Sequence, residues 1–390
     1  MSHNVLLANY IEEIRTRLRN QQRTVYSVTN TKGFVPSLDV FDKQVFSTDI
    51  SNYKLVAQND LAYNPSRINV GSVAICPDPQ GGAVSPMYVI VRCKNGLLPA
   101  YLLHFLKSDV GLAEINLRTE GAVRFQLKFK DLQRIPIYLP SKEEQTRIVR
   151  LLDEADALRR LRARADTRMA AFIPALFHEM FGDPVLNEKG WPLVLVSSFV
   201  HGFEAGKSIL TEGIENPKSQ YRVLKVSAVT WKNYQPEESK PVPPDYNPLI
   251  HHIVRKGDLL FSRANTTQLV GATAFVFETP PNILLPDKLW RFVWEEPLKI
   301  DPLFVWSLFL HPSIRYELGS RATGTSGSMK NISMQKVLSM KAILPPLALQ
   351  HEFAARVQAA RVIQAQQAAS RARLEALFQS MLARAFAGEL

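Results

Sequence analysis

Two long stretches of the chain place apolar residues three and four positions apart, the spacing that puts side chains on one face of an α-helix. The apolar positions are Ile148, Leu151, Ala155, Leu158, Ala165, Met169, Phe172 and Leu176 in the first stretch and Phe353, Val357, Ala360, Ile363, Leu374, Leu377 and Met381 in the second. This alternation is the heptad pattern of a coiled coil. We therefore expect two long helices that pair in antiparallel fashion and leave other faces for a partner.

The two stretches are copies of one another. An offset of 205 positions relates them, as Pro140 and Pro345 show, and the same offset places Gln145 on Gln350. A repeat at a long fixed period indicates a duplicated architecture. At about 1.5 Å per residue, each predicted helix spans roughly 55 Å, on the order of one and a half turns of B-DNA.

The residues that precede each long helix also match. NDLAYN at residues 59–64 corresponds to GDLLFS at residues 257–262. Around these segments, short β-branched and aromatic runs are broken by Gly, Pro, Asn and Asp, a texture typical of strands and loops. Each half then has an apolar segment that predicts a short helix, PAYLLHFL at residues 99–106 and PLFVWSLFL at residues 302–310.

These patterns predict an α/β protein with an internal pseudo-twofold repeat. Two similar α/β domains are expected, separated by two long antiparallel coiled-coil helices. The predicted segments are residues 1–138 for the first domain, 139–185 for the first helix, 186–343 for the second domain and 344–390 for the second helix.

The beginning of the first half does not match the second half. Residues 4–20 have apolar positions at helical spacing, which predicts an amphipathic helix packed on the first domain. These positions are Val5, Leu7, Ile11, Ile14 and Leu18. Residues 187–207 have no evident counterpart in the first half, so the edge of the first domain stays open.

The order of the segments resembles the specificity subunit of a type I restriction-modification system. The matching features are an α/β half, a long helix that opens with Leu-Pro and a nearby Gln, a second α/β half and a second long helix. The resemblance covers essentially the whole chain. Its most specific local matches are LPSKEEQTRIV, LPPLALQHEFA, NDLAYN, GDLLFSR and the terminal LARAFAGEL.

This resemblance implies two target recognition domains, each reading one half of a bipartite site in double-stranded DNA, with helices that set the spacing. It also implies that the chain is not itself an enzyme. The implied partners are two adenine methyltransferase subunits, which carry S-adenosylmethionine, and motor-nuclease subunits that complete an endonuclease of phage defence. In the chain itself, the resemblance implies no catalytic residue, cofactor or metal.

Composition and charge agree with a DNA partner. A chain of 390 residues is longer than one hydrophobic core usually serves. The formal net charge of +11 favours a polyanion such as nucleic acid, or less directly an acidic membrane surface. No apolar run is long enough to span a bilayer, and the N-terminus lacks the apolar stretch of a signal peptide. We therefore expect a cytoplasmic protein without a membrane partner.

Three features match the motifs of other activities only in part. Residues 201–208, HGFEAGKS, end like a phosphate-binding loop, but His201 stands where that loop needs a glycine. The segment NPSR at residues 64–67 departs from the Asn-Pro-Pro-aromatic motif of amino-methyltransferases at its last two positions. Cys76 and Cys93 match no zinc or redox spacing. These departures favour a binding subunit over the alternative of an enzyme with an unfamiliar active site.

DNA contacts call for polar and basic side chains on loops or strands, where they read base edges or bind phosphate. Each half has two such regions at equivalent positions. The candidates are Asn64, Ser66, Arg67, Arg118, Thr119, Arg124 and Gln126 in the first half and Arg263, Asn265, Thr267, Gln268, Arg321, Thr323, Thr325, Ser326, Ser328 and Lys330 in the second. The stretch GSRATGTSGSMKN at residues 319–331 is the strongest, because Gly and small hydroxyl residues permit close approach of the backbone to phosphate. The alternative for this stretch is a flexible surface loop.

Two further alternatives stay open. A coiled-coil scaffold that organises other proteins, without reading a DNA sequence, would have the same helices. The basic residues Arg159, Arg160 and Arg164 of the first helix would face either DNA or an acidic partner, or form a solvated face. The target sequence and spacer length do not follow from the chain, because base choice depends on side-chain placement and DNA deformability.

Overall fold

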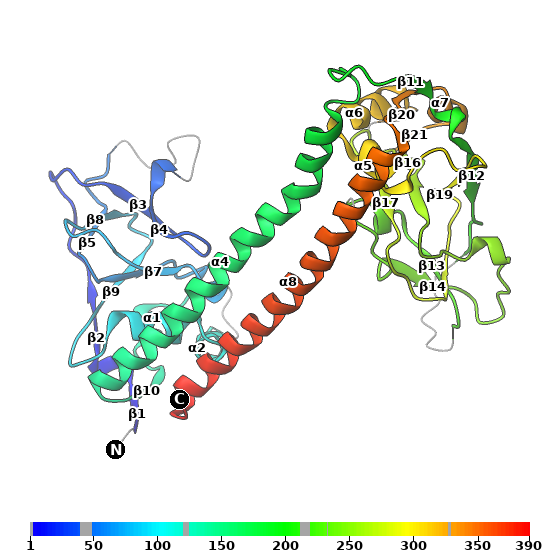
Figure 1. Cartoon of the computed structure of the whole chain (residues 1–390). Coiled ribbons are helices and arrows are strands. Elements are labelled where there is room, and N and C mark those ends of the chain that lie inside the picture. Colours follow the sequence, from blue (N-terminus) through cyan, green and yellow to red (C-terminus); the bar gives the residue numbers. More distant parts are fainter. Residues whose placement is uncertain (1–2, 40–48, 120–124, 211–218, 232, 327–328) are drawn as a thin grey trace. The chain divides into compact units, whose positions relative to one another are not determined.

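The computed structural model describes residues 3–39, 49–119, 125–210, 219–231, 233–326 and 329–390. The chain divides into two compact units, the first made of residues 1–164 and 367–390 and the second of residues 165–366. Each unit therefore combines a globular domain with part of both long helices (Figure 1).

The described residues of the first unit form three small sheets. One sheet has the order β2 (Ile11–Ile14), β9 (Val89–Cys93), β6 (Leu61–Tyr63), β7 (Val73–Ile75). Another has the order β4 (Gly33–Pro36), β3 (Val25–Thr29), β8 (Gly82–Val84), β5 (Lys54–Val56). The third pairs β1 (His3–Leu6) with β10 (Pro136–Leu139). The short helices are α1 (Pro99–Lys107), α2 (Asp109–Leu117) and α3 (Phe129–Leu132).

The second unit repeats this topology. The sheet that corresponds to the first has the order β12 (Val200–Ala205), β19 (Leu289–Trp294), β15 (Leu259–Ser262), β17 (Thr273–Phe275). The sheet that corresponds to the second has the order β14 (Ser239–Pro241), β13 (Arg222–Leu224), β18 (Ile283–Leu284). The last pairs β11 (Leu193–Leu195) with β22 (Lys341–Ile343). Its short helices are α5 (Pro302–Leu310), α6 (Pro312–Arg321) and α7 (Met334–Leu338). A further sheet has the order β16 (Ala264–Asn265), β21 (Met329–Asn331), β20 (Thr323–Ser326). The shared strand order confirms the predicted α/β repeat.

The two long helices predicted from the apolar pattern are confirmed. They are α4 (Lys142–Phe181) and α8 (Leu347–Ala387). In the first unit, Arg159 of α4 pairs with Glu375 of α8 at 2.7 Å, and Arg147, earlier in α4, donates to the carbonyl of Leu390, beyond the end of α8, at 2.6 Å. An earlier residue of α4 thus contacts a later residue of the second stretch, so the two helices run antiparallel. Arg159 therefore forms an ion pair within the chain and is not part of a purely solvated helix face.

The repeat extends to the packing of each core. In the first unit, the ring of Phe386 from α8 lies 5.2 Å from the ring of Tyr101 from α1. In the second unit, the ring of Phe181 from α4 lies 4.9 Å from the ring of Phe304 from α5. The end of each long helix thus occupies the same place in one of the two cores, which is the pseudo-twofold relation that the repeat predicted.

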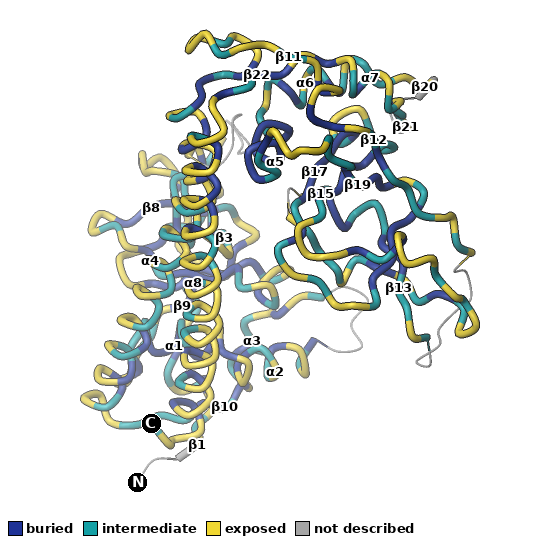
Figure 2. The backbone as a smooth tube through the Cα atoms, turned by 45° about the vertical axis from the view of Figure 1, so that its right-hand side comes forward, coloured by how far each residue is buried: buried dark blue, intermediate teal, exposed yellow. Residues whose placement is uncertain are grey.

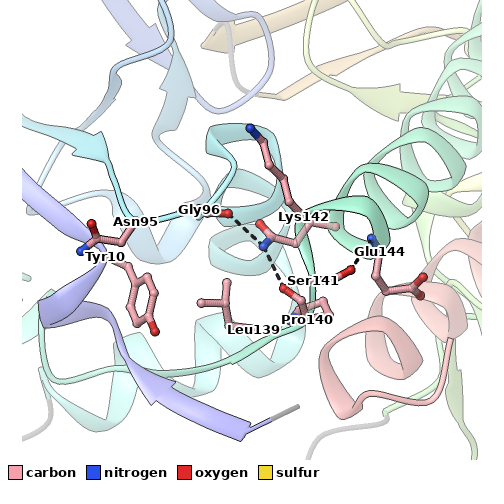
Figure 3. Close-up of a pocket in the computed structure, with 9 residues that line it drawn as sticks. Tyr10, Asn95, Gly96, Leu139, Pro140, Ser141, Lys142 and Glu144 are labelled. Atoms are coloured by element: carbon pink, nitrogen blue, oxygen red, sulfur yellow. Dashed lines mark hydrogen bonds between the residues drawn. The ribbon is translucent and has the colours of Figure 1, made fainter. Parts of the chain in front are cut away.

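Buried glutamines explain the Gln that follows each Leu-Pro. In the first unit, the Oε1 of Gln145 accepts a hydrogen bond from the backbone N–H of Leu98 at 2.9 Å. Its Nε2 donates to the carbonyls of Gly96 and Pro140, two residues that Figure 3 labels. In the second unit, the Oε1 of Gln350 accepts from the N–H of Asp301, also at 2.9 Å. Each glutamine ties the start of a long helix to the start of α1 or α5, so this motif is structural.

A repeated ion pair explains the match between NDLAYN and GDLLFSR. Asp60 at the start of β6 accepts a hydrogen bond from Arg92 of β9 at 2.8 Å. Asp258 at the start of β15 accepts one from Arg291 of β19 at 3.1 Å. Both aspartates are largely buried, with side chains 1% and 14% exposed, so these residues hold neighbouring strands together rather than face a ligand.

The amphipathic helix predicted for residues 4–20 is wrong. The segment forms β1, a 3-10 turn (Leu7–Asn9) and β2, which pair with β10 and β9. The second unit has the same series in β11, a 3-10 turn (Val196–Ser198) and β12. The start of the chain is therefore the counterpart of residues 193–205, and the apparent mismatch between the two halves disappears.

Candidate nucleic-acid interface

In the first unit, the candidate residues after β6 form a tight loop. The Oδ1 of Asn64 accepts a hydrogen bond from the N–H of Ser66 at 3.0 Å, and its N–H donates to the Ser72 carbonyl at 3.1 Å. Asn64 is only 8% exposed, so its side chain shapes the loop. Ser66 and Arg67 are exposed and available to a ligand.

A second candidate region lies beside this loop. The N–H of Leu127 donates to the Pro65 carbonyl at 3.0 Å, and the hydroxyl of Tyr63 donates to the Leu127 carbonyl at 3.2 Å. Gln126, next to this junction, is exposed. The structure thus brings together two candidate regions about sixty positions apart. Arg124 lies outside the described residues.

Two other candidates of the first unit are engaged inside the fold. The guanidinium of Arg118 forms an ion pair with Glu114, one helical turn earlier, and donates to the Arg134 carbonyl at 2.8 Å. Thr119 is 6% exposed, and its hydroxyl donates to the Ile115 carbonyl at 3.0 Å. Both residues stabilise the end of α2, and the structure does not group them with the exposed loop residues.

The second unit has the same junction. Asn265 of β16 pairs with Lys330 of β21, and the N–H of Ile332 donates to the Arg263 carbonyl at 3.0 Å. Arg263 is half-buried, and its Nε donates to the carbonyl of Asp287 at 3.0 Å. In the loop that follows β16, Thr267 and Gln268 are exposed.

The described residues of the stretch at 319–331 lie in a helix end and two strands. α6 ends at Arg321, β20 and β21 pair in antiparallel fashion, and β16 adds a third strand. Thr323 is exposed, whereas Thr325 and Ser326 are placed in β20 by their backbone alone. Ser328 lies outside the described residues. Thr323 is thus presented by a paired strand, which costs less entropy on binding than a free loop.

The charges around this junction differ in how they are compensated. Lys330 donates to the Gly324 carbonyl at 2.8 Å, and Lys336 donates to the Arg321 carbonyl at 2.7 Å. A backbone carbonyl does not neutralise a cation, and neither lysine has an ion pair within the described part of the chain. Arg321, in contrast, forms an ion pair with Glu317 at 2.6 Å. The junction therefore keeps net positive charge, which suits a polyanion.

Sequence reasoning passed over Lys336, because it lies in α7 and the candidates were sought in loops. It missed Arg315 for the same reason. Arg315 lies in α6 and donates from Nη2 to the Gln268 carbonyl at 2.9 Å. Both residues lie about one helical turn from the stretch at residues 319–331, and a search for basic residues at that distance would have identified them.

The described residues also bear on the activities that the sequence matched in part. The segment at residues 201–208 begins within β12, and a Cβ added at Gly206 would lie 1.6 Å from the Leu285 carbonyl, so the backbone is packed where a phosphate cradle needs space. No helix in the described part of the chain has the length and apolar character needed to cross a membrane. Within the same residues, no group of three or more His, Cys, Asp and Glu is arranged to hold a metal ion.

Comparison with known proteins shows which proteins the chain resembles. A family described as "Type I restriction modification DNA specificity domain" matches residues 20–165. The EcoKI specificity subunit of Escherichia coli K12 is 29% identical over 324 residues, which cover 77% of this chain and 68% of that protein. The chain is similar to specificity subunits of type I restriction-modification systems. This result supports a subunit that recognises DNA sequence, and the scaffold alternative is not favoured.

Two solved structures share the fold of this chain. A chain from a structure that addresses complex assembly and conformational transition of a type I restriction-modification system has a TM-score of 0.63 at 17% identity, with 100% of this chain and 98% of that chain covered. A specificity subunit from M. genitalium has a TM-score of 0.57 at 12% identity, with 99% and 96% covered. At these identities the similarity concerns the fold alone. It spans both globular domains and both long helices.

Proposed function

We propose that this chain is a DNA specificity subunit that reads a bipartite target, with one half-site bound by each unit. The observation that carries the proposal is the repeated junction, in which a loop after β6 or β15 lies beside the segment that leads into α3 or α7. Exposed polar side chains gather at this junction in both units, and in the second unit uncompensated lysines accompany them. Base-edge reading and phosphate binding require these two kinds of group.

Substituting one exposed candidate in each unit tests the division into half-sites. Arg67→Ala is expected to weaken recognition of the first half-site, and Gln268→Ala that of the second, each by about 1–3 kcal/mol. Sequencing of methylated adenines in cells that carry the system gives the effect on each half-site. Arg356→Ala, an exposed residue of α8 that pairs with Glu352, is the control. Loss of both half-sites from either single substitution would contradict the proposal.

The partners belong to the same proposal. Two methyltransferase subunits, with S-adenosylmethionine as the methyl donor, would methylate adenine in the target, and motor-nuclease subunits would add DNA cleavage. The chain would supply recognition to that complex and not catalysis. The lengths of α4 and α8, at 40 and 41 residues, would set the spacer between half-sites.

Exposed apolar residues on the long helices support methyltransferase docking. In the first unit, Leu158 and Leu161 of α4 are 53% and 59% exposed, and Leu377 of α8 is 54% exposed. Leu158 and Leu377 belong to the heptad pattern but are not covered by the neighbouring helix, and long exposed stretches of α8 are visible in Figure 2. Apolar side chains left exposed by a folded chain commonly mark a protein interface.

Charge introduced on this face should block assembly. The double substitution Leu158→Glu with Leu161→Glu is expected to weaken methyltransferase binding at least about tenfold, because it would bury two carboxylates in an apolar contact. Ser380→Glu with Ala383→Glu adds the same charge at the same spacing on α8, at exposed positions that are not leucine. Co-purification and titration calorimetry compare the two. Equal losses in both double variants would point to net charge instead of this face.

A further inference from the structure

Arg315 packs against the loop that presents Thr267 and Gln268 in the second unit. Its Nη2 donates to the Gln268 carbonyl at 2.9 Å. A Cβ added at Gly271 would lie 3.0 Å from its Nη1, so the guanidinium fills the space under the loop. The Nη1 itself is buried and has no hydrogen-bond partner among the described residues.

The charge of this guanidinium is not compensated. No ion pair of Arg315 occurs in the described part of the chain, and burial lowers its pKa to about 10. Arg315 is half-buried, and shielding its Nη1 from solvent without a counter-ion costs free energy. Such a cost is typical of a functional site, where a ligand can supply the missing charge.

The first unit shows that the shared fold does not require this cation. Leu112 of α2 is the residue equivalent to Arg315, and it packs against the apolar core of that unit. The adjoining loops turn in the same way, because Gly71 and Gly271 have φ values of 85° and 76°. A Cβ added at Gly71 would meet only the Cβ of Asn30 within 4 Å, at 3.8 Å, so the loop of the first unit forms with no cation beneath it. The arginine is therefore not needed for a loop of this kind.

We propose that Arg315 is a positioning residue for the second half-site, which holds the Gln268 loop in place and provides positive charge for a DNA phosphate. This inference rests on the proposed reading of a half-site by the second unit. The hydrogen bond to the Gln268 carbonyl fixes the loop backbone. The charge attracts a phosphate to the exposed side of the loop, where the Thr267 hydroxyl is available to donate.

The test measures DNA binding by the purified complex of the full chain with its methyltransferase subunits. The probes are a duplex that carries the site found by methylated-adenine sequencing and a duplex of equal length without it. Arg315→Met is expected to weaken binding to the first duplex about tenfold and to lower the salt slope by about one phosphate contact. Arg315→Lys, which keeps the charge, should retain the salt slope. Arg356→Met removes one charge elsewhere in the second unit and should change neither quantity.

Stability separates this role from a merely structural one. If the guanidinium serves DNA, the unfolding midpoint of Arg315→Met in urea should be no lower than that of the wild-type chain, because the variant loses a half-buried charge that has no counter-ion. A lower unfolding midpoint with an unchanged salt slope would overturn the inference, as would unchanged binding. If the wild-type complex does not distinguish the two duplexes, the proposed function fails and the inference fails with it.

Discussion

Replacing Phe353 with alanine will lower the free energy of unfolding of the second unit by about 3–5 kcal/mol. The ring is fully buried, and its centroid lies 5.4 Å from that of Phe181 and 5.8 Å from that of Phe177. Phe304 of α5 completes the cluster. Alanine would leave a cavity where α4, α8 and α5 meet, and the unit would lose both burial and packing.

Urea unfolding followed by tryptophan fluorescence measures this loss. All five tryptophans of the chain lie in the second unit, so their fluorescence reports on that unit alone. Phe172→Ala is the matched control, because it makes the same change on α4 in the same unit at a ring that is 43% exposed. We expect it to cost less than about 1 kcal/mol. Equal losses would contradict the central place of Phe353 in this core.

Much of the fold can be predicted from the sequence because the two halves of the chain can be aligned with each other. The offset of 205 positions joins Pro140 to Pro345 and places the two long helices. The start of the chain shows where such reasoning stops. Leu7 and Ile11 are buried and four positions apart, a spacing that a helix shares with a strand, turn and strand. This segment forms strands and not a helix because it pairs with β10 and β9, which lie far along the chain. No local sequence pattern shows that pairing.

The candidate site could be predicted as regions but not as individual side chains. The repeat indicated both regions of each unit, and the structure places them side by side. It also ties Arg118 to Glu114 and Arg321 to Glu317, pairs whose spacing of four was visible in the sequence as a helical ion pair. Arg315 was overlooked because the candidates were sought in loops. Its place near the stretch at residues 319–331 was visible in the sequence, but its contact with Gln268 depends on how α6 packs against a distant loop.

Removing Arg291 will destabilise the second unit by about 3–5 kcal/mol near neutral pH. The guanidinium is 12% exposed, pairs with Asp258 at 3.1 Å and also pairs with Glu204. It further donates to the carbonyls of His251 and Ile253. Arg291→Met would leave the buried Asp258 carboxylate without its counter-ion, which costs more than the pair itself contributes. Urea unfolding followed by tryptophan fluorescence again gives the loss.

The deficit of Arg291→Met should shrink as the pH falls. Burial raises the pKa of Asp258, and the Arg291 guanidinium opposes that rise. Without Arg291, the folded pKa of Asp258 moves further above its unfolded value of about 3.9. The folded variant then holds a proton that the unfolded chain has released, and the associated stability is lost as the pH rises through the folded pKa. The difference from wild type should therefore be smaller near about pH 5 than near about pH 7.

A second substitution shows whether the Asp258 charge is the cause. Asp258→Asn keeps an oxygen that can accept the 2.8 Å hydrogen bond from the N–H of Arg255, but it removes the charge. Added to Arg291→Met, it should recover part of the lost stability and abolish the pH dependence of the deficit. Lys256→Met, which breaks an exposed pair with Glu278, should cost only about 0–1 kcal/mol. If Asp258→Asn recovers nothing, the lost bonds to backbone carbonyls, and not an uncompensated carboxylate, must account for the deficit.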